Sequence, residues 1–378
     1  MNKNLISLLN ISRWGAAFLV VLSHVKTLIL VDFNSVAHPS LIIKAFYLLS
    51  GLGHEAVVVF FVISGFLVGG ITFKKWTSNG PRVLEYFIHR FSRIYIVLIP
   101  ALLLGGLTDW LGLNWFNGSS LYTDTTSYGI ASLFNIISDQ LSFEVFLQNV
   151  VMLEEICAPV LGSNGPLWSL AYEWWYYILF ALICLAYLSK GLKRYSLAVI
   201  FIAICSLLPA KLIFMMTIWW LGFVLYIIYD KIKFPQIPIV FAIIFFITMA
   251  LCRISRIKET GFEPILVLKD LLLGVTYCML LLSINKGQFN WKPSKIHEYL
   301  SEFSYSLYLT HFPIMILLVA FNYQVFNVKF KLQPSLFSVA YVTFTIFMLY
   351  IVAFIFSRVT ESHTHQVKKI LHNKFIGG

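Results

Sequence analysis

Residues 57–67 read Val-Val-Val-Phe-Phe-Val-Ile-Ser-Gly-Phe-Leu and form the centre of a mainly apolar stretch over about residues 48–73. A helix that crosses a membrane needs about 20 residues of this kind. The strands of a membrane β-barrel show only a weak alternating pattern of apolar residues. The solid run of apolar residues therefore predicts a transmembrane helix.

The rest of the chain has the same character. Of the 378 residues 59% are hydrophobic and only 12% are charged, whereas soluble proteins have about 45–50% apolar and about 25% charged residues. So little polar surface excludes a soluble enzyme, a disordered chain and a disulfide-stapled domain. Ten windows are apolar enough to span a membrane, and they lie at about 11–31, 48–73, 94–108, 166–188, 195–210, 212–229, 234–252, 265–284, 303–321 and 336–356. We therefore predict an all-α polytopic membrane protein with about ten transmembrane helices in a single domain over residues 1–378.

The net charge of +11 is explained by topology. With the N-terminus in the cytoplasm and ten crossings, 19 of the 28 Lys and Arg residues fall in cytoplasmic segments. The longest outer segment, 108–165, has six acidic residues and no basic one, and the loop with Arg253, Arg256 and Lys258 is an exception to the pattern. This positive-inside bias predicts that both termini are cytoplasmic, and it argues against a nucleic-acid partner.

Three further expectations concern local features and metal binding. Leu133–Leu153 places apolar residues at intervals of three or four among Asp139, Glu144 and Asn149, which predicts an interfacial amphipathic helix on the outer face. Arg13 and His24 interrupt the first apolar stretch, so we expect no cleavable signal peptide. The five cysteines lack the spacing of metal ligands, and we expect no bound metal.

The first apolar stretch carries two groups that a membrane tolerates poorly, Arg13 and His24. Eleven helical steps place both on one face, about 16 Å apart along the axis. A cation at the inner end and an imidazole at mid-membrane would suit a substrate with phosphates at one end and a reactive group at the other. The alternative is that Arg13 snorkels to lipid headgroups and His24 forms a hydrogen bond within the bundle.

Arg90 and Arg93 are three residues apart and share a helix face at the inner end of the third stretch. Two guanidinium groups at a cytoplasmic entrance can bind phosphate oxygens in a bidentate manner. Ordinary positive-inside anchoring is the alternative, and spacing alone favours it.

Three apolar runs contain further polar groups. Ser64 precedes Gly65, a pair that also suits close helix packing. Glu173 lies deep in the fourth stretch, where it serves either catalysis or a hydrogen bond between helices, and His311 lies beside Pro313 in the ninth. Two buried histidines, one buried carboxylate and inner arginines together indicate an intramembrane reaction site reached from the cytoplasm.

Five sequence motifs, in order along the chain, resemble the membrane-bound acyltransferase-3 family. They are Arg13 and His24 with ten residues between them, Phe60-Phe-Val-Ile-Ser-Gly-Phe66, Arg90-x-x-Arg93, Pro166-Leu-Trp-Ser-Leu-Ala-Tyr-Glu173 and Ser304-Tyr-Ser-Leu-Tyr-Leu-Thr-His311. Each motif is weak alone, but together they cover residues 13 to about 361.

The resemblance implies an integral membrane enzyme that transfers an acyl group, most often acetyl from acetyl-CoA, to a hydroxyl of a carbohydrate bound for the cell surface. The acceptor would be a polysaccharide such as lipopolysaccharide O-antigen, or its lipid-linked precursor, at a bacterial inner membrane. Carried over by position, His24 would be the catalytic histidine, as a general base or a transient acyl carrier, and Glu173 would be a second residue of the catalytic site. The remaining candidates would bind the donor's phosphates (Arg13, Arg90, Arg93) or line and brace the substrate site (Ser64, His311, Glu361).

The sequence departs from the family in two places. Family members often have an Asp two residues before the paired Phe, where this chain has Val58, with Glu55 one helical turn earlier. Some relatives carry an additional outer hydrolase-like domain, and with 17 residues after Glu361 we expect none here. A transporter or flippase of an acyl donor or lipid-linked sugar is the first alternative function, and a receptor whose polar residues only join helices is the second.

Overall fold

The computed structural model describes residues 3–130, 133, 135–256, 264–284 and 295–376. Within these ranges every regular element is a helix, and nine helical segments are long and apolar enough to cross a membrane. The protein is therefore an all-α polytopic membrane protein, as predicted. Lys258, the third basic residue of the exceptional outer loop, lies outside the described ranges.

The fifth predicted span, 195–210, is the one that differs. It corresponds to helix α8 (Gly191–Leu207), which has 17 residues and falls just short of the length of the other segments. Leu208 adopts an extended backbone conformation directly after it, because the ring of Pro209 disfavours the helical region for the residue that precedes it. The third predicted span, 94–108, is also short, but the helix that contains it is long. This helix is α5 (Val83–Trp115), with 33 residues.

The chain forms two compact units, and several helices pass from one to the other. The first unit comprises Met1–Ala16, His54–Phe87 and Tyr172–Tyr299. The second comprises Ala17–Gly53, Ile88–Ala171 and Leu300–Gly378.

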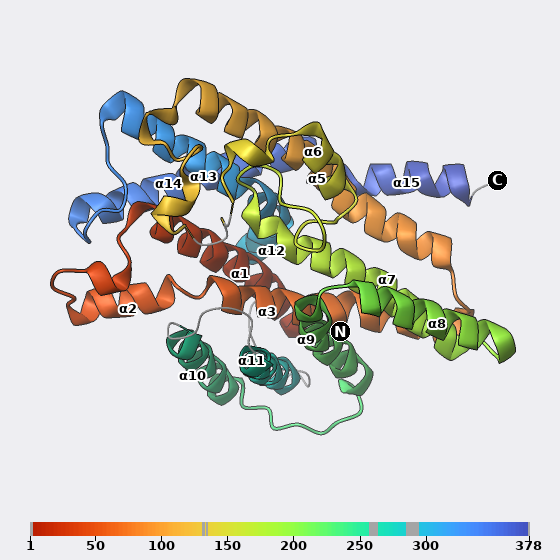
Figure 1. The fold of residues 1–378 in the computed structure, drawn as a ribbon. Coiled ribbons are helices and arrows are strands. Elements are labelled where there is room, and N and C mark those ends of the chain that lie inside the picture. Colours follow the sequence, from red (N-terminus) through yellow and green to blue (C-terminus); the bar gives the residue numbers. More distant parts are fainter. Residues whose placement is uncertain (1–2, 131–132, 134, 257–263, 285–294, 377–378) are drawn as a thin grey trace. The chain divides into compact units, whose positions relative to one another are not determined.

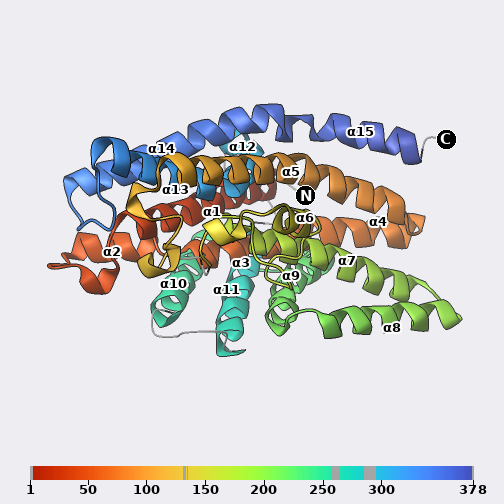
Figure 2. The same ribbon diagram turned by 45° about the horizontal axis from the view of Figure 1, so that its top comes forward.

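The first unit contains a continuous helical segment that changes type in its middle. This segment is α3 (Gly53–Ser64), a π-helical turn η2 (Gly65–Gly70) and α4 (Ile71–Asn79). The other helices wholly in the unit or largely so are α7 (Trp168–Leu188), α8, α9 (Ala210–Ile228), α10 (Pro238–Arg256) and α11 (Pro264–Ser283). Helices α10 and α11 run side by side (Figures 1 and 2).

The π-helical turn packs directly against α9 through glycines on both sides. A Cβ atom on Gly65 would overlap with the backbone carbonyl of Trp219, and one on Gly222 would overlap with that of Val62. Small residues permit such close approach of two membrane helices. Close helix packing, the alternative interpretation of the Ser64–Gly65 pair, is therefore the role of Gly65. Ser64 lies at the same helix crossing.

We expect Gly222→Ala to destabilise the protein by about 1–3 kcal/mol, because the added methyl group forces two helix backbones apart. Thermal unfolding in detergent measures the effect. Gly15→Ala is the matched control, since a Cβ atom at Gly15 would meet nothing within 4 Å. Equal melting temperatures for the two variants would contradict the backbone contact.

The second unit is built around α13 (Ser304–Phe326), which packs along α14 (Leu336–Val359) (Figures 1 and 2). Residues on all sides of α13 are buried, as expected for a helix at the centre of a bundle. The unit also contains the later parts of α1 (Lys3–Ile29) and α5, with the shorter elements η1 (Phe33–Ser35), α2 (Leu41–Leu49), η3 (Asn117–Ser119), η4 (Thr125–Tyr128), η5 (Ser138–Gln140), α6 (Phe143–Val150), η6 (Gly165–Leu167), η7 (Glu361–His363) and α15 (Thr364–Phe375). Helix α12 (Lys295–Glu302) begins in the first unit and ends in this one.

The predicted interfacial helix over residues 133–153 is only eight residues long in the structure, as α6. Helix α6 starts late because Ser142 has an extended backbone and its side chain accepts a hydrogen bond from the amide of Val145, an N-cap. Asn149 then ties the helix inward by accepting from the amide of Leu161 and donating to the carbonyl of Pro159. In the described residues before Ser142 the periodic pattern therefore produced no α-helix, only the three-residue 3₁₀ helix η5 (Ser138–Gln140).

Candidate active site

In the second unit, the two buried histidines of the sequence analysis meet. His24 of α1 and His311 of α13 place Nδ1 and Nε2 2.9 Å apart, and their ring planes differ by only 7°. His311 is fully buried, His24 is 9% exposed, and the ring of Phe312 packs against that of His24 with ring centres 5.0 Å apart and planes 72° apart. The structure thus brings together two candidates that lie 287 residues apart in the chain.

The hydrogen bonds of His311 define the tautomers of both rings when both are neutral. Nδ1 of His311 lies 2.8 Å from the carbonyl oxygen of Tyr308 and 3.2 Å from that of Leu307. A carbonyl oxygen only accepts, so Nδ1 carries the proton and Nε2 has the lone pair. His24 must then donate from its own Nδ1, which assigns the lone pair of His24 to Nε2. An imidazole in this tautomer can accept a proton or act as a nucleophile through Nε2.

Tyr308 also connects α13 to the beginning of α7 and to the turn η6 that precedes it. Its hydroxyl donates to the carbonyl oxygen of Pro166 at 3.0 Å and lies 2.6 Å from the hydroxyl of Ser169. Asn164 donates to the carbonyl oxygen of Leu309 at 3.1 Å. These bonds fix the turn of α13 that holds His311.

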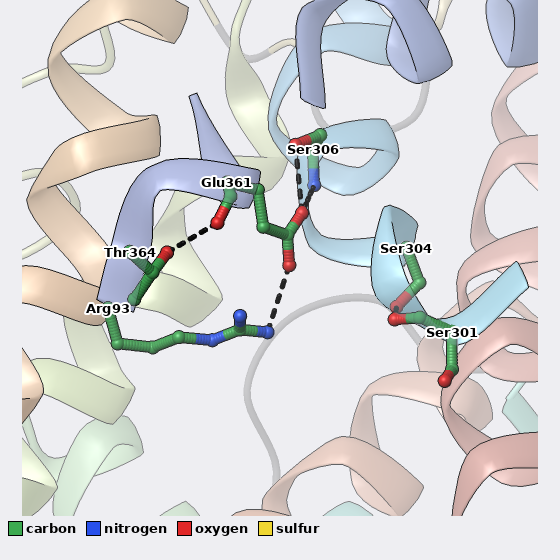
Figure 3. A network of polar contacts seen from close by, with 6 residues as sticks. All are labelled: Arg93, Ser301, Ser304, Ser306, Glu361 and Thr364. Atoms are coloured by element: carbon green, nitrogen blue, oxygen red, sulfur yellow. Dashed lines mark hydrogen bonds and ion pairs between the residues drawn. The ribbon is translucent and has the colours of Figure 1, made fainter. Parts of the chain in front are cut away.

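A second cluster lies around Glu361, which follows α14 directly (Figure 3). One carboxylate oxygen lies 3.0 Å from the guanidinium of Arg93, and the other accepts from both the amide and the hydroxyl of Ser306, at 3.1 and 2.9 Å. Ser306 is in the first turn of α13, where amides lack partners within the helix. Glu361 therefore caps α13 and holds it to α5.

Arg93 also lies over the ring of Tyr305, with its guanidinium carbon 5.5 Å from the ring centre. Its side chain is 36% exposed, whereas that of Glu361 is 4% exposed. Arg90 is half-buried one helical turn earlier on α5. One terminal nitrogen of the Arg93 guanidinium is thus bound to Glu361. The other N–H donors, on the exposed part of the side chain, can bind another ligand.

The first unit holds Arg13, Ser64 and Glu173. Ser64 accepts from the indole nitrogen of Trp219 at 3.0 Å and lies 3.3 Å from the hydroxyl of Tyr177, which donates to Glu173 at 2.5 Å. Tyr177 has a single proton, so the hydroxyl of Ser64 donates to Tyr177. The network ends on Glu173, which is half-buried on α7 and accepts the bond from Tyr177 one turn later. Arg13 is half-buried on the first half of α1.

Two further carboxylates were assigned by the sequence to an outer loop, but they are completely buried. Asp109 lies within α5 and accepts from the amide and hydroxyl of Ser163 at 2.7 and 2.8 Å. Glu154 lies after α6, and burial raises its pKa to about 8, so it holds a proton at neutral pH. The apolar neighbours of each acidic residue were the available signal of burial. The sequence did not indicate the partner of Asp109, because Ser163 is 54 residues away.

The comparison with family models gives one match, described as an acyltransferase domain, and it covers residues 6–358. The comparisons with curated proteins and with solved structures give no match. The matched range includes the whole His24–His311 pair, Arg90, Arg93 and the Ser64–Glu173 network, but it ends before Glu361.

Proposed function

The chain belongs to the acyltransferase-3 family and is an integral membrane acyltransferase, and from that premise we propose that it is an acyl-CoA-dependent O-acyltransferase with His24 as its catalytic residue. The observation that carries the proposal is the hydrogen bond between His24 and His311, which leaves a lone pair on Nε2 of His24. Nothing else in the described part of the second unit offers an imidazole held in a defined tautomer by a second imidazole.

In the proposed reaction, Nε2 of His24 removes the proton from an acceptor hydroxyl. The hydroxyl oxygen attacks the thioester carbonyl of the acyl donor, and the tetrahedral intermediate collapses with cleavage of the carbon–sulfur bond. His24 returns the proton to the departing thiolate of coenzyme A, so that the products are an ester and free thiol. A positioned base of this kind contributes about 10²–10⁴-fold to a rate. His311 positions His24 and does not need to gain or lose a proton.

The same lone pair permits a second route, in which Nε2 attacks the thioester and forms a transient acyl-histidine. The carbon–sulfur bond breaks in this step and coenzyme A leaves as the thiolate. The oxygen of the acceptor hydroxyl then attacks the acyl carbon, the bond from that carbon to Nε2 breaks, and the hydroxyl proton goes to the thiolate, so that the products are again an ester and free thiol. Both routes require the tautomer that His311 imposes, and both place the reacting atom on Nε2 of His24.

For the substrates, we propose acetyl-CoA as the donor and a surface polysaccharide, or its lipid-linked precursor, as the acceptor in a bacterial inner membrane. Arg13, Arg90 and Arg93 are the proposed ligands of the donor's phosphates. The positive-inside bias supports cytoplasmic termini, which require an even number of crossings. Helix α8 would supply the tenth, because 17 residues is the lower limit for a span and its aliphatic side chains, such as Leu192 and Ile202, are exposed.

Purified full-length protein, incubated in detergent with radiolabelled acetyl-CoA and a membrane glycolipid extract, tests the proposal. We expect label in an extractable glycan. Label that remains on the protein alone, and is absent from a His24→Ala variant, would support the acyl-histidine route with the acceptor missing.

Detergent removes the separation of two compartments, so a transporter or flippase would give no transfer in this experiment. Folded protein that neither binds acetyl-CoA nor transfers label would overturn the donor assignment. His365→Ala is a matched control, because this histidine is exposed on α15 and should leave the transfer unchanged.

A further inference from the structure

A cavity of about 300 Å³ lies in the first unit, between the beginning of α1 and the beginning of α12. Helix α1 contributes Lys3, Ser7 and Asn10 to its wall, and α12 contributes Lys295, His297 and Glu298. None of these residues belongs to the candidate active site. Ligand pockets have volumes of about 300–1,000 Å³, so this cavity can hold part of a cofactor-sized molecule.

The lining has the chemistry of a phosphate site. Lys3 and Lys295 supply two exposed ammonium groups, and Asn10 supplies an amide donor. Lysine binds phosphate as a compact point charge with three donors. Glu298 is the one acidic group among the lining residues, so the two lysines outweigh it.

His297 adds a directed donor. The indole nitrogen of Trp14 donates to its Nδ1 at 3.2 Å, and the two rings lie parallel within 6°. In the neutral imidazole the proton is then on Nε2, which becomes the donor that is not used by Trp14. Trp14 therefore fixes both the tautomer and the plane of His297 at the cavity wall.

Ser7 provides an independent sign of a missing ligand. Its side chain is 4% exposed, it lines the cavity, and its hydroxyl has no hydrogen-bond partner among the residues that the structure describes. A buried hydroxyl without a partner is destabilising, and a bound acceptor oxygen would offset that cost.

The cavity residues of α1 recur at helical spacing and continue to a proposed donor-binding residue. Lys3, Ser7, Asn10 and Arg13 are separated by four, three and three residues, so they share one face of the helix. In the proposed orientation this end of α1 is cytoplasmic, which is the side where acyl-CoA is present. A ligand bound by the cavity would therefore lie along the helix face that leads to Arg13.

We propose that this cavity binds the phosphorylated nucleotide end of acyl-CoA, with Lys3, Lys295 and His297 on its phosphate oxygens and Ser7 and Asn10 as neutral donors. The assignment rests on the proposed function, since it takes acyl-CoA as the donor. An anionic lipid headgroup offers the same phosphate chemistry from the membrane, and the experiment has to separate the two sources.

The test uses full-length protein in detergent and the variant pair Lys3→Gln/Lys295→Gln. Calorimetric titration with coenzyme A and with 3′-phospho-ADP should show dissociation constants raised at least about 10-fold. The pair Lys44→Gln/Lys369→Gln is the matched control, because it removes two exposed lysines of the second unit and should bind as wild type does. S-acetyl-pantetheine lacks the nucleotide, so wild type and variant should use it with the same KM.

The other outcomes are equally specific. Wild-type affinity in the Lys3→Gln/Lys295→Gln variant, in protein that still transfers acetyl, would overturn the nucleotide site and leave the proposed function intact. Unchanged affinity for coenzyme A with loss of co-purified phosphatidylglycerol would assign the cavity to a lipid headgroup and also overturn the proposal. Failure of wild type to bind coenzyme A or transfer acetyl would instead remove the proposed function itself.

Discussion

Replacing His24 with Asn is expected to lower acyl transfer by about 10²–10⁴-fold or more while the protein remains folded. The amide nitrogen of Asn can occupy the place of Nδ1 and keep the hydrogen bond to His311, but Asn has no atom in the place of Nε2. The substitution therefore removes the reacting atom and retains the contact that packs α1 against α13. The rate of label transfer from acetyl-CoA, with thermal unfolding measured in parallel, gives both quantities.

Two comparisons make this result interpretable. His24→Ala loses both the base and the hydrogen bond, so it should be as inactive as His24→Asn and less stable. His311→Gln can still accept from His24, but it loses the bond to the carbonyl of Tyr308, and it should retain part of the activity. Transfer by His24→Asn at the wild-type rate would exclude Nε2 as the reacting atom.

Hydropathy and charge were enough to predict the class of the fold. Nine of the ten apolar windows lie in helical segments that are long and apolar enough to cross a membrane, because a membrane helix satisfies its backbone internally and needs only length and apolar side chains. The window at 195–210 differed because Pro209 limits α8 to 17 residues. The predicted helix over 133–153 is shorter because Ser142 is the N-cap of α6. Its side-chain hydrogen bond starts the helix at this position, although the apolar periodicity begins earlier.

The candidate site was predictable as a set of residue types but not as a set of contacts. His24 and His311 stood out because an ionisable group in an apolar run needs a partner, whereas Glu361 was named only through the family resemblance. The sequence alone could not say that His24 pairs with His311, or that Glu361 pairs with Arg93, because each pair joins helices from distant parts of the chain. Tyr308 belongs to one of the sequence motifs, but the sequence did not indicate its role. Its backbone carbonyl accepts from His311, and its hydroxyl donates to the carbonyl of Pro166. The catalytic and binding roles of these residues stay predictions.

The second large effect is expected at Glu361. Glu361→Ala should lower the free energy of unfolding by about 3 kcal/mol, because it leaves the amide and hydroxyl of Ser306 without an acceptor and removes the partner of Arg93. Arg93 is partly exposed, so water replaces some of the lost interaction and keeps the effect below that of a fully buried pair. Unfolding in detergent measures the change. Glu302→Ala, at an exposed position in the last turn of α12, is the matched control and should unfold like wild type.

A double-mutant cycle on Glu361 and Arg93 then separates bracing from donor binding. The bracing role predicts that Arg93→Ala and Glu361→Ala both destabilise, and that the double variant is more stable than the sum of the two losses, by about 0.5–3 kcal/mol. The phosphate-binding role adds a different result, since Arg93→Ala would raise the KM for acetyl-CoA while Glu361→Ala, which releases the guanidinium, would not. Additive losses of stability would show that the 3.0 Å contact is not an energetic pair. Because only part of the Arg93 donor set is bound to Glu361 and the Arg93 side chain is 36% exposed, we expect both results.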